Sequence, residues 1–117
     1  MKSYIVIGLG RFGTEVAIRL CQLGCEVLAV DSRNEPVQQI SDDVTHAVVA
    51  DARDVSVLRA LGAAEFDCGI VAIGGNLAES VLATMSLKEL GIFEIYPEEK
   101  KRFYVKAPVF SFNKIRG

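Results

Sequence analysis

The chain has 117 residues, the size of one domain, and half of them are apolar, so it can fill a single hydrophobic core. Its 13 basic and 15 acidic residues give a formal net charge of −2, which argues against a surface committed to nucleic acid. The chain lacks the apolar run of ~20 residues that would cross a bilayer, and its N-terminus lacks the pattern of a signal peptide. We therefore expect one cytoplasmic domain over residues 1–117 with no nucleic-acid partner.

The first third of the chain alternates short apolar segments with helical patterns. Tyr4–Ile7 is apolar without alternation, as is typical of a strand buried on both faces of a parallel sheet. A helical pattern then runs to Gly24, and Glu26–Asp31 follows as a second strand with an acidic end. A short helix is expected over Glu35–Ile40, started by a capping box of Ser32 and Glu35.

The same alternation continues further along the chain. Thr45–Ala50 predicts a third strand, a helical stripe over 55–61 follows, and Cys68–Ile73 predicts a fourth strand. A helix is expected over Leu77–Leu90. Strands and helices that alternate with short connections predict βαβ units with right-handed crossovers. The fold class is therefore α/β, a Rossmann-type doubly wound parallel sheet of order 3-2-1-4-5, with its ligand crevice where strands 1 and 4 diverge.

From about residue 92 the pattern becomes atypical. Phe103–Ala107 is the candidate for the fifth strand, and too few residues follow Pro108 for a further helix and a sixth strand. We therefore expect the C-terminal part of the doubly wound sheet to be incomplete.

Two apolar stripes share the expected helix over 77–90. The first stripe should face the sheet and comprises Ala78, Val81, Leu82 and Met85. The second should face either another subunit or the C-terminal segment Phe103–Phe112, and comprises Ala83, Leu87 and Leu90.

The glycines between the first strand and the first helix predict a nucleotide site. Gly8-x-Gly10-x-x-Gly13 follows a strand, opens a helix, and precedes an acidic strand end at Asp31. Gly8 permits the tight turn, Gly10 leaves room for a pyrophosphate, and Gly13 lets the helix approach the strand. The helix N-terminus offers N–H groups and partial positive charge to phosphates.

Polar side chains at the neighbouring strand ends extend this site. Asp31 can accept hydrogen bonds from both hydroxyls of an adenosine ribose, which disfavours NADP, although it could also cap a turn. Asp51 could accept from the adenine amino group or cap the next helix. Arg11 could close over phosphates or face solvent, and Phe12 is expected to pack under the helix. Gly74, Gly75 and Asn76 flank the crevice from the other side.

Residues for catalysis or metal binding do not form a recognisable set. Cys21, Cys25 and Cys68 lack framework or metal-ligand spacing, and we expect reduced thiols without a metal. His46 opens a strand away from the crevice, and a second domain for a substrate is not evident. The pattern favours a nucleotide sensor that is not an enzyme over the alternative, a cofactor-binding fragment of an NAD-dependent oxidoreductase.

Four segments together resemble a known family: Ile7–Gly13, Val27–Asp31, Ala50–Ala52 and Val71–Gly74. They are similar to the KTN, or RCK, regulatory domain of bacterial potassium channels and of Trk- and Ktr-type potassium uptake systems. The likeness covers the chain from Met1 to about Gly91.

The resemblance implies a cytosolic regulatory domain that binds NAD(H) or ATP/ADP as a ligand. It implies a homodimer or a higher, ring-like oligomer, held at the inner face of the cell membrane by a membrane-embedded potassium transporter or channel subunit. Carried over by position, the candidate cofactor-binding residues are Gly8, Gly10, Arg11, Phe12, Gly13, Asp31, Ser32, Asp51, Ala52, Ala72, Ile73, Gly74 and Asn76.

Overall fold

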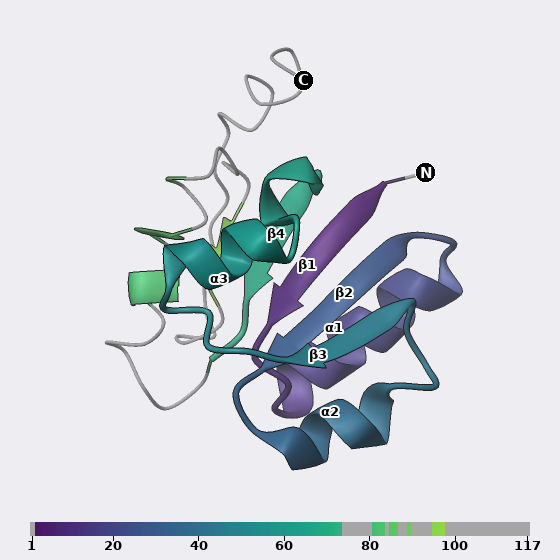
Figure 1. The fold of residues 1–117 in the computed structure, drawn as a ribbon. Coiled ribbons are helices and arrows are strands. Elements are labelled where there is room, and N and C mark those ends of the chain that lie inside the picture. The colour runs from purple at the N-terminus through teal and green to yellow at the C-terminus, as the bar shows by residue number, and fades with distance from the viewer. Residues whose placement is uncertain (1, 74–80, 84, 87–88, 90–94, 98–117) are drawn as a thin grey trace.

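The computed structural model describes residues 2–73, 81–83, 85–86, 89 and 95–97. In this part of the chain, strands and helices alternate as predicted (Figure 1). The elements are β1 (Ser3–Ile7), α1 (Arg11–Gln22), β2 (Glu26–Asp31), α2 (Asn34–Ile40), β3 (His46–Val49), α3 (Val55–Ala60), a 3-10 turn over Ala63–Glu65, β4 (Cys68–Val71) and β5 (Ile95–Pro97). Among the described helices, none is long and apolar enough to cross a membrane.

The strands form one parallel sheet of order β3-β2-β1-β4-β5 within the described residues. β1 is central, with Ile5 in register with Leu28 of β2 on one side and with Gly69 of β4 on the other. The predicted α/β fold class is confirmed, and so is the predicted order 3-2-1-4 of the first four strands. Because all strands run the same way, their carboxyl ends meet at one edge of the sheet, where the loops after β1, β2 and β3 gather.

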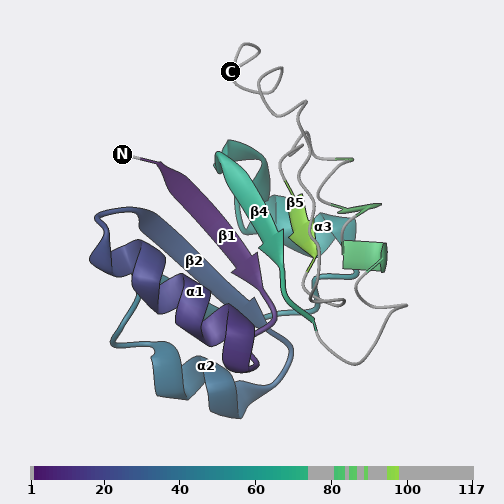
Figure 2. The same ribbon diagram turned by 180° about the vertical axis from the view of Figure 1, so that it is seen from behind.

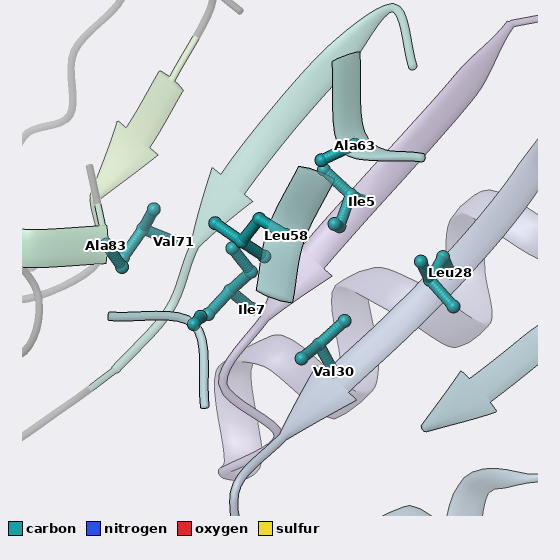
Figure 3. Packing of buried hydrophobic residues seen from close by; sticks show 9 residues of the cluster. Ile5, Ile7, Leu28, Val30, Leu58, Ala63, Val71 and Ala83 are labelled. Carbon is teal, nitrogen blue, oxygen red and sulfur yellow. The ribbon is translucent and has the colours of Figure 1, made fainter. Parts of the chain in front are cut away.

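Helices cover both faces of this sheet, as Figures 1 and 2 show from opposite sides. On one face, α1 and α2 pack through Ala17, Val37 and Ile40 against alternate β residues such as Val6 and Val27. On the other face, Leu58 of α3 and Ala63 lie over Ile5, Ile7 and Val30 (Figure 3). Alternate residues of the central strands are therefore buried on opposite faces, which explains why these strands read as unbroken apolar runs.

Of the helix predicted over 77–90, the structure describes Val81, Leu82, Ala83, Met85, Ser86 and Glu89, and these residues turn a different side to the sheet from the one predicted. Ala83 is fully buried and packs in the cluster that contains Val71 (Figure 3), whereas Val81, Leu82 and Met85 are 45%, 45% and 59% exposed. The prediction that the stripe of larger residues faces the sheet is wrong. Ala83 makes the contact instead, and because residues two positions apart on a helix point about 200° from one another, its burial turns Val81 and Met85 outward. Leu87 and Leu90 lie outside the described residues.

The start of α2 and the position of the fifth strand also differ from the predictions. The N-cap of α2 is Arg33 without a side-chain capping bond, so the capping box of Ser32 and Glu35 does not form. Asp31 accepts the Arg33 N–H, and Arg33 is extended and takes the N-cap position in place of Ser32. The helix begins at Asn34, one residue earlier than predicted. β5 is Ile95–Pro97, hydrogen-bonded to β4, and the predicted strand Phe103–Ala107 lies outside the described residues. β5 is only three residues long, and its pairing with the edge of β4 is what defines it as a strand.

Candidate functional site

A cavity of about 490 Å³ opens at the carboxyl edge of the sheet, beside the start of α1. Its lining comes from the ends of β1, β2, β3 and β4 and from the loops that follow them. The described lining residues are Ile7, Gly8, Leu9, Gly10, Arg11, Phe12, Asp31, Ser32, Arg33, Ala50, Asp51, Ala52, Arg53, Ala72 and Ile73. In a doubly wound sheet this edge, where neighbouring strands diverge, is the usual place for a ligand.

The turn from β1 into α1 requires glycine at two positions. Gly8 has φ +103°, and a Cβ there would lie 2.6 Å from the carbonyl oxygen of Ala72. A Cβ on Gly13 would collide with the carbonyl oxygen of Gly8. These two residues therefore let α1 start directly against the ends of β1 and β4, as predicted from the glycine spacing.

Gly10 serves the cavity rather than the packing of the turn. It is the N-cap of α1 with φ −80° and ψ −158°, and the helix has no side-chain capping bond at this end. A Cβ on Gly10 would meet nothing within 4 Å, so the missing side chain leaves open space in front of the helix. The first N–H groups of a helix carry partial positive charge and suit an anion. This cradle fits a phosphate group.

The carboxylate of Asp31 joins the ends of β1 and β2. Its Oδ2 accepts from the N–H of Leu9 at 2.7 Å and from Nη2 of Arg33 at 3.1 Å. Its Oδ1 accepts from the N–H of Arg33 at 2.8 Å and from its Nε at 3.0 Å. Burial raises the pKa of Asp31, but the hydrogen bonds from Arg33 and Leu9 outweigh burial, and the pKa lies below its ordinary value of 3.8. Asp31 is therefore an ionised, inward-facing acceptor on the cavity wall.

Asp51 repeats this arrangement one strand further along. Its Oδ1 accepts from the N–H and Nε of Arg53 at 3.0 and 2.9 Å, and its Oδ2 accepts from Nη2 at 2.8 Å. Hydrogen bonds from Arg53 lower the pKa of Asp51 to about 2. The predicted alternative that Asp51 caps the next helix is wrong, because Asp54 is the N-cap of α3 and accepts from the N–H of Ser56.

Arg11 and Phe12 both stand at the mouth of the cavity. Phe12 is 45% exposed and lines the cavity, so the prediction that it packs under α1 is wrong. The first turn of α1 buries Gly13 instead, which leaves no room beneath the helix for an aromatic ring. Arg11 is exposed, and among the described residues its guanidinium forms no ion pair. It can therefore turn toward an anion in the cavity.

Most of the predicted site residues lie together in the cavity wall. Those that line it are Gly8, Gly10, Arg11, Phe12, Asp31, Ser32, Asp51, Ala52, Ala72 and Ile73. Gly13 lies behind the wall, in the packing of α1, and Gly74 and Asn76 lie outside the described residues.

Arg33 and Arg53 were not among the predicted site residues, although both line the cavity. The sequence does carry a signal for them: an Asp-x-Arg triplet begins with the last residue of β2, and a second one begins shortly after β3. With Arg11, they give the described lining three arginines against two aspartates. The wall thus combines donors for an anion with two carboxylates that accept from hydroxyl or amino groups.

Comparison with solved structures supports the fold. The NAD(P)-binding domain of an exopolyphosphatase-related protein from Archaeoglobus fulgidus superposes with a TM-score of 0.67 at 26% identity, covering 97% of this chain and 83% of that chain. The Shewanella denitrificans Kef CTD in its AMP-bound form gives a TM-score of 0.67 at 22% identity, covering 82% of this chain and 58% of that one. The similarity to the Kef CTD is a similarity of fold alone.

Comparison with sequences identifies the family. Ktr system potassium uptake protein C of Bacillus subtilis (strain 168) is 42% identical over 106 residues, which are 91% of this chain and 48% of the relative. Protein A of the Ktr system in the same organism is 43% identical, and its counterpart in Vibrio alginolyticus 34%, each over 106 residues. The chain spans about half the length of these relatives. Residues 4–96 match the TrkA-N domain, and the chain therefore belongs to the TrkA-N domain family.

Proposed function

We propose that this domain is a nucleotide-sensing regulatory module of a potassium uptake system and that it binds an adenosine nucleotide, NAD(H) or ATP/ADP, in the cavity at the start of α1. The observation that carries the proposal is one wall that joins an uncapped helix N-terminus behind Gly10 to the buried, ionised carboxylate of Asp31. The first suits a phosphate chain and the second suits the hydroxyls of a ribose. The relatives' role in potassium uptake supports the wider assignment.

Each part of the nucleotide has a matching part of the wall. The N–H groups at the start of α1 and the guanidinium of Arg11 would hold the phosphates, and Asp31 would hold the ribose. Asp51 and Ala52, which follow the neighbouring strand, would border the adenine. A 2′-phosphate beside Asp31 would meet a negative charge, so NADP(H) should bind more weakly than NAD(H), ATP or ADP.

Calorimetric titration of the chain with ADP, ATP, NADH and NADPH tests this proposal. Asp31→Ala removes the hydrogen bonds of a charged acceptor and should weaken ADP and NADH by about 1.5–3 kcal/mol, roughly tenfold to a hundredfold. Glu26→Ala is the matched control, because it removes an exposed carboxylate at the start of β2, outside the cavity wall. Equal affinity of wild type and Asp31→Ala for ADP would remove the ribose assignment, and tighter binding of NADPH than of NADH would reverse the selectivity.

The alternative function is that of a cofactor-binding fragment of an NAD-dependent oxidoreductase, and the solved NAD(P)-binding domain that this chain resembles keeps it open. An oxidoreductase needs a place for a hydride acceptor beside the nicotinamide. Incubating the chain with NADH and small oxidants distinguishes the two: steady NADH consumption would favour the oxidoreductase. Identifying the nucleotide that co-purifies with the protein would indicate which ligand the site selects.

The domain should act as a homodimer or a higher oligomer, beside a membrane-embedded transporter or channel subunit. The supporting feature is the exposed apolar face formed by Val81, Leu82 and Met85. These side chains fall on one side of a helix, and large apolar side chains gathered on a surface favour association. A second copy of this face, meeting the first across a two-fold axis, would cover all three residues.

A further inference from the structure

The hydrogen bonds of Asp31 leave no acceptor position for a ribose. An ionised carboxylate offers about four positions for donors. Asp31 uses two for backbone N–H groups, those of Leu9 and Arg33, and two for Nε and Nη2 of the Arg33 side chain. The backbone donors are held by the turns after β1 and β2. Only the two guanidinium donors can leave without unfolding the loops.

The guanidinium also lies on the side from which a ligand would arrive. The side chain of Asp31 is 6% exposed and that of Arg33 is 64% exposed, so Arg33 covers the carboxylate on its solvent side. It contacts one carboxylate oxygen through Nε and the other through Nη2. The 2′- and 3′-hydroxyls of a ribose are likewise two adjacent donors, and they suit the same pair of oxygens.

We infer that Arg33 is an internal competitor for the ribose site: the nucleotide binds only by exchanging its two ribose hydroxyls for the two guanidinium donors on Asp31. This inference rests on the proposed nucleotide function. Arg33 would then set the affinity of the site and its preference for ligands with a complete diol. A ligand without the hydroxyls cannot replace the two hydrogen bonds that Asp31 loses when Arg33 leaves. Such a ligand must bind beside an intact Asp31–Arg33 pair.

Arg33→Lys tests the exchange without changing the charge of the cavity. Lysine keeps the positive charge but cannot form the two parallel hydrogen bonds of a guanidinium. ADP should therefore bind about two- to fivefold more tightly to Arg33→Lys than to wild type, from the value of a single ion pair. The affinity for 2′,3′-dideoxy-ADP, which lacks both donors, should not increase.

The decisive quantity is the ratio of the dissociation constants of 2′,3′-dideoxy-ADP and ADP, measured by calorimetry on the whole chain. Arg33→Lys should raise this ratio. Arg53→Lys is the matched control, since it alters the same kind of pair in the same cavity at Asp51, and it should leave the ratio unchanged because both ligands carry the same adenine.

The outcomes separate this inference from the proposed function. If Asp31→Ala weakens ADP while Arg33→Lys leaves the ratio at the wild-type value, the competition by Arg33 is refuted and the nucleotide site stands. An equal rise in the ratio for Arg33→Lys and Arg53→Lys would also refute it, because the effect would then not be specific to Asp31. If wild type binds neither ADP nor NADH, the proposed function and this inference fail together.

Discussion

Replacing single glycines of the β1–α1 turn by alanine should separate the ligand site from the fold. At Gly8 the new Cβ would lie 2.6 Å from the oxygen and 2.7 Å from the carbon of the Ala72 carbonyl, at φ +103°. Strain at positive φ costs about 1–2 kcal/mol and overpacking about 1–3 kcal/mol. Gly8→Ala should therefore lower the free energy of unfolding by about 2–5 kcal/mol, and Tm by roughly 4 °C for each kcal/mol.

The same substitution at Gly10 should affect binding and leave the fold intact. Gly10 has φ −80°, which any residue adopts, and its Cβ would meet nothing within 4 Å. Replacing glycine by alanine lowers the conformational entropy of the unfolded chain, which stabilises the fold, whereas alanine is a poorer N-cap, which destabilises it. These two effects offset each other to within about 1 kcal/mol. The added methyl would stand where a phosphate approaches the start of α1. ADP affinity should fall about tenfold or more, since hydrogen bonds to a charged group are worth about 1.5–3 kcal/mol.

Chemical denaturation and calorimetry on both variants measure the two effects. Wild-type ADP affinity in Gly10→Ala would refute a phosphate site in front of α1. Wild-type stability of Gly8→Ala would refute the requirement for glycine in the turn. A loss of stability at Gly10 comparable to that at Gly8 would mean that the space in front of α1 is not open.

Three further predictions concern the core, the carboxylate and the apolar face. Leu58→Ala should lower the free energy of unfolding, measured by urea denaturation, by about 2–5 kcal/mol, because this fully buried side chain fills the contact between α3 and the sheet. Arg59 is exposed, and Arg59→Ala should change the same free energy by less than about 0.5 kcal/mol. Asp31 has a pKa below 3.8 in the folded chain, so its ionised form stabilises the fold above about pH 4. The difference in free energy of unfolding between wild type and Asp31→Asn should therefore shrink as pH falls below about 4. A difference that grows there would contradict the direction of the pKa shift. Met85→Glu should shift sedimentation from dimer toward monomer, and a wild type that is monomeric at high concentration would exclude this interface.

The periodicity of the chain was sufficient to predict the order of strands and helices over the first seventy or so residues. Uninterrupted apolar runs occur where a strand is covered on both faces, and the two core clusters on either side of β1 explain the run in Tyr4–Ile7. The handedness of βαβ crossovers then restricts the strand order to few alternatives. The glycine spacing predicted the turn because the close approach of α1 to β1 and β4 excludes a Cβ at Gly8 and Gly13.

Other features were decided only by the tertiary structure, because they depend on which groups meet across the fold. A helix with two apolar stripes does not reveal which stripe faces the sheet, and here the small side chain of Ala83 took the place predicted for larger residues. The three-residue β5 is too short to show a pattern, and pairing with the free edge of β4 defines it. Asp31 and Asp51 stood out in the sequence as acidic residues at strand ends. The pairing of each carboxylate with the arginine two residues later was not predictable, because the geometry of each turn brings the two side chains together on one cavity wall.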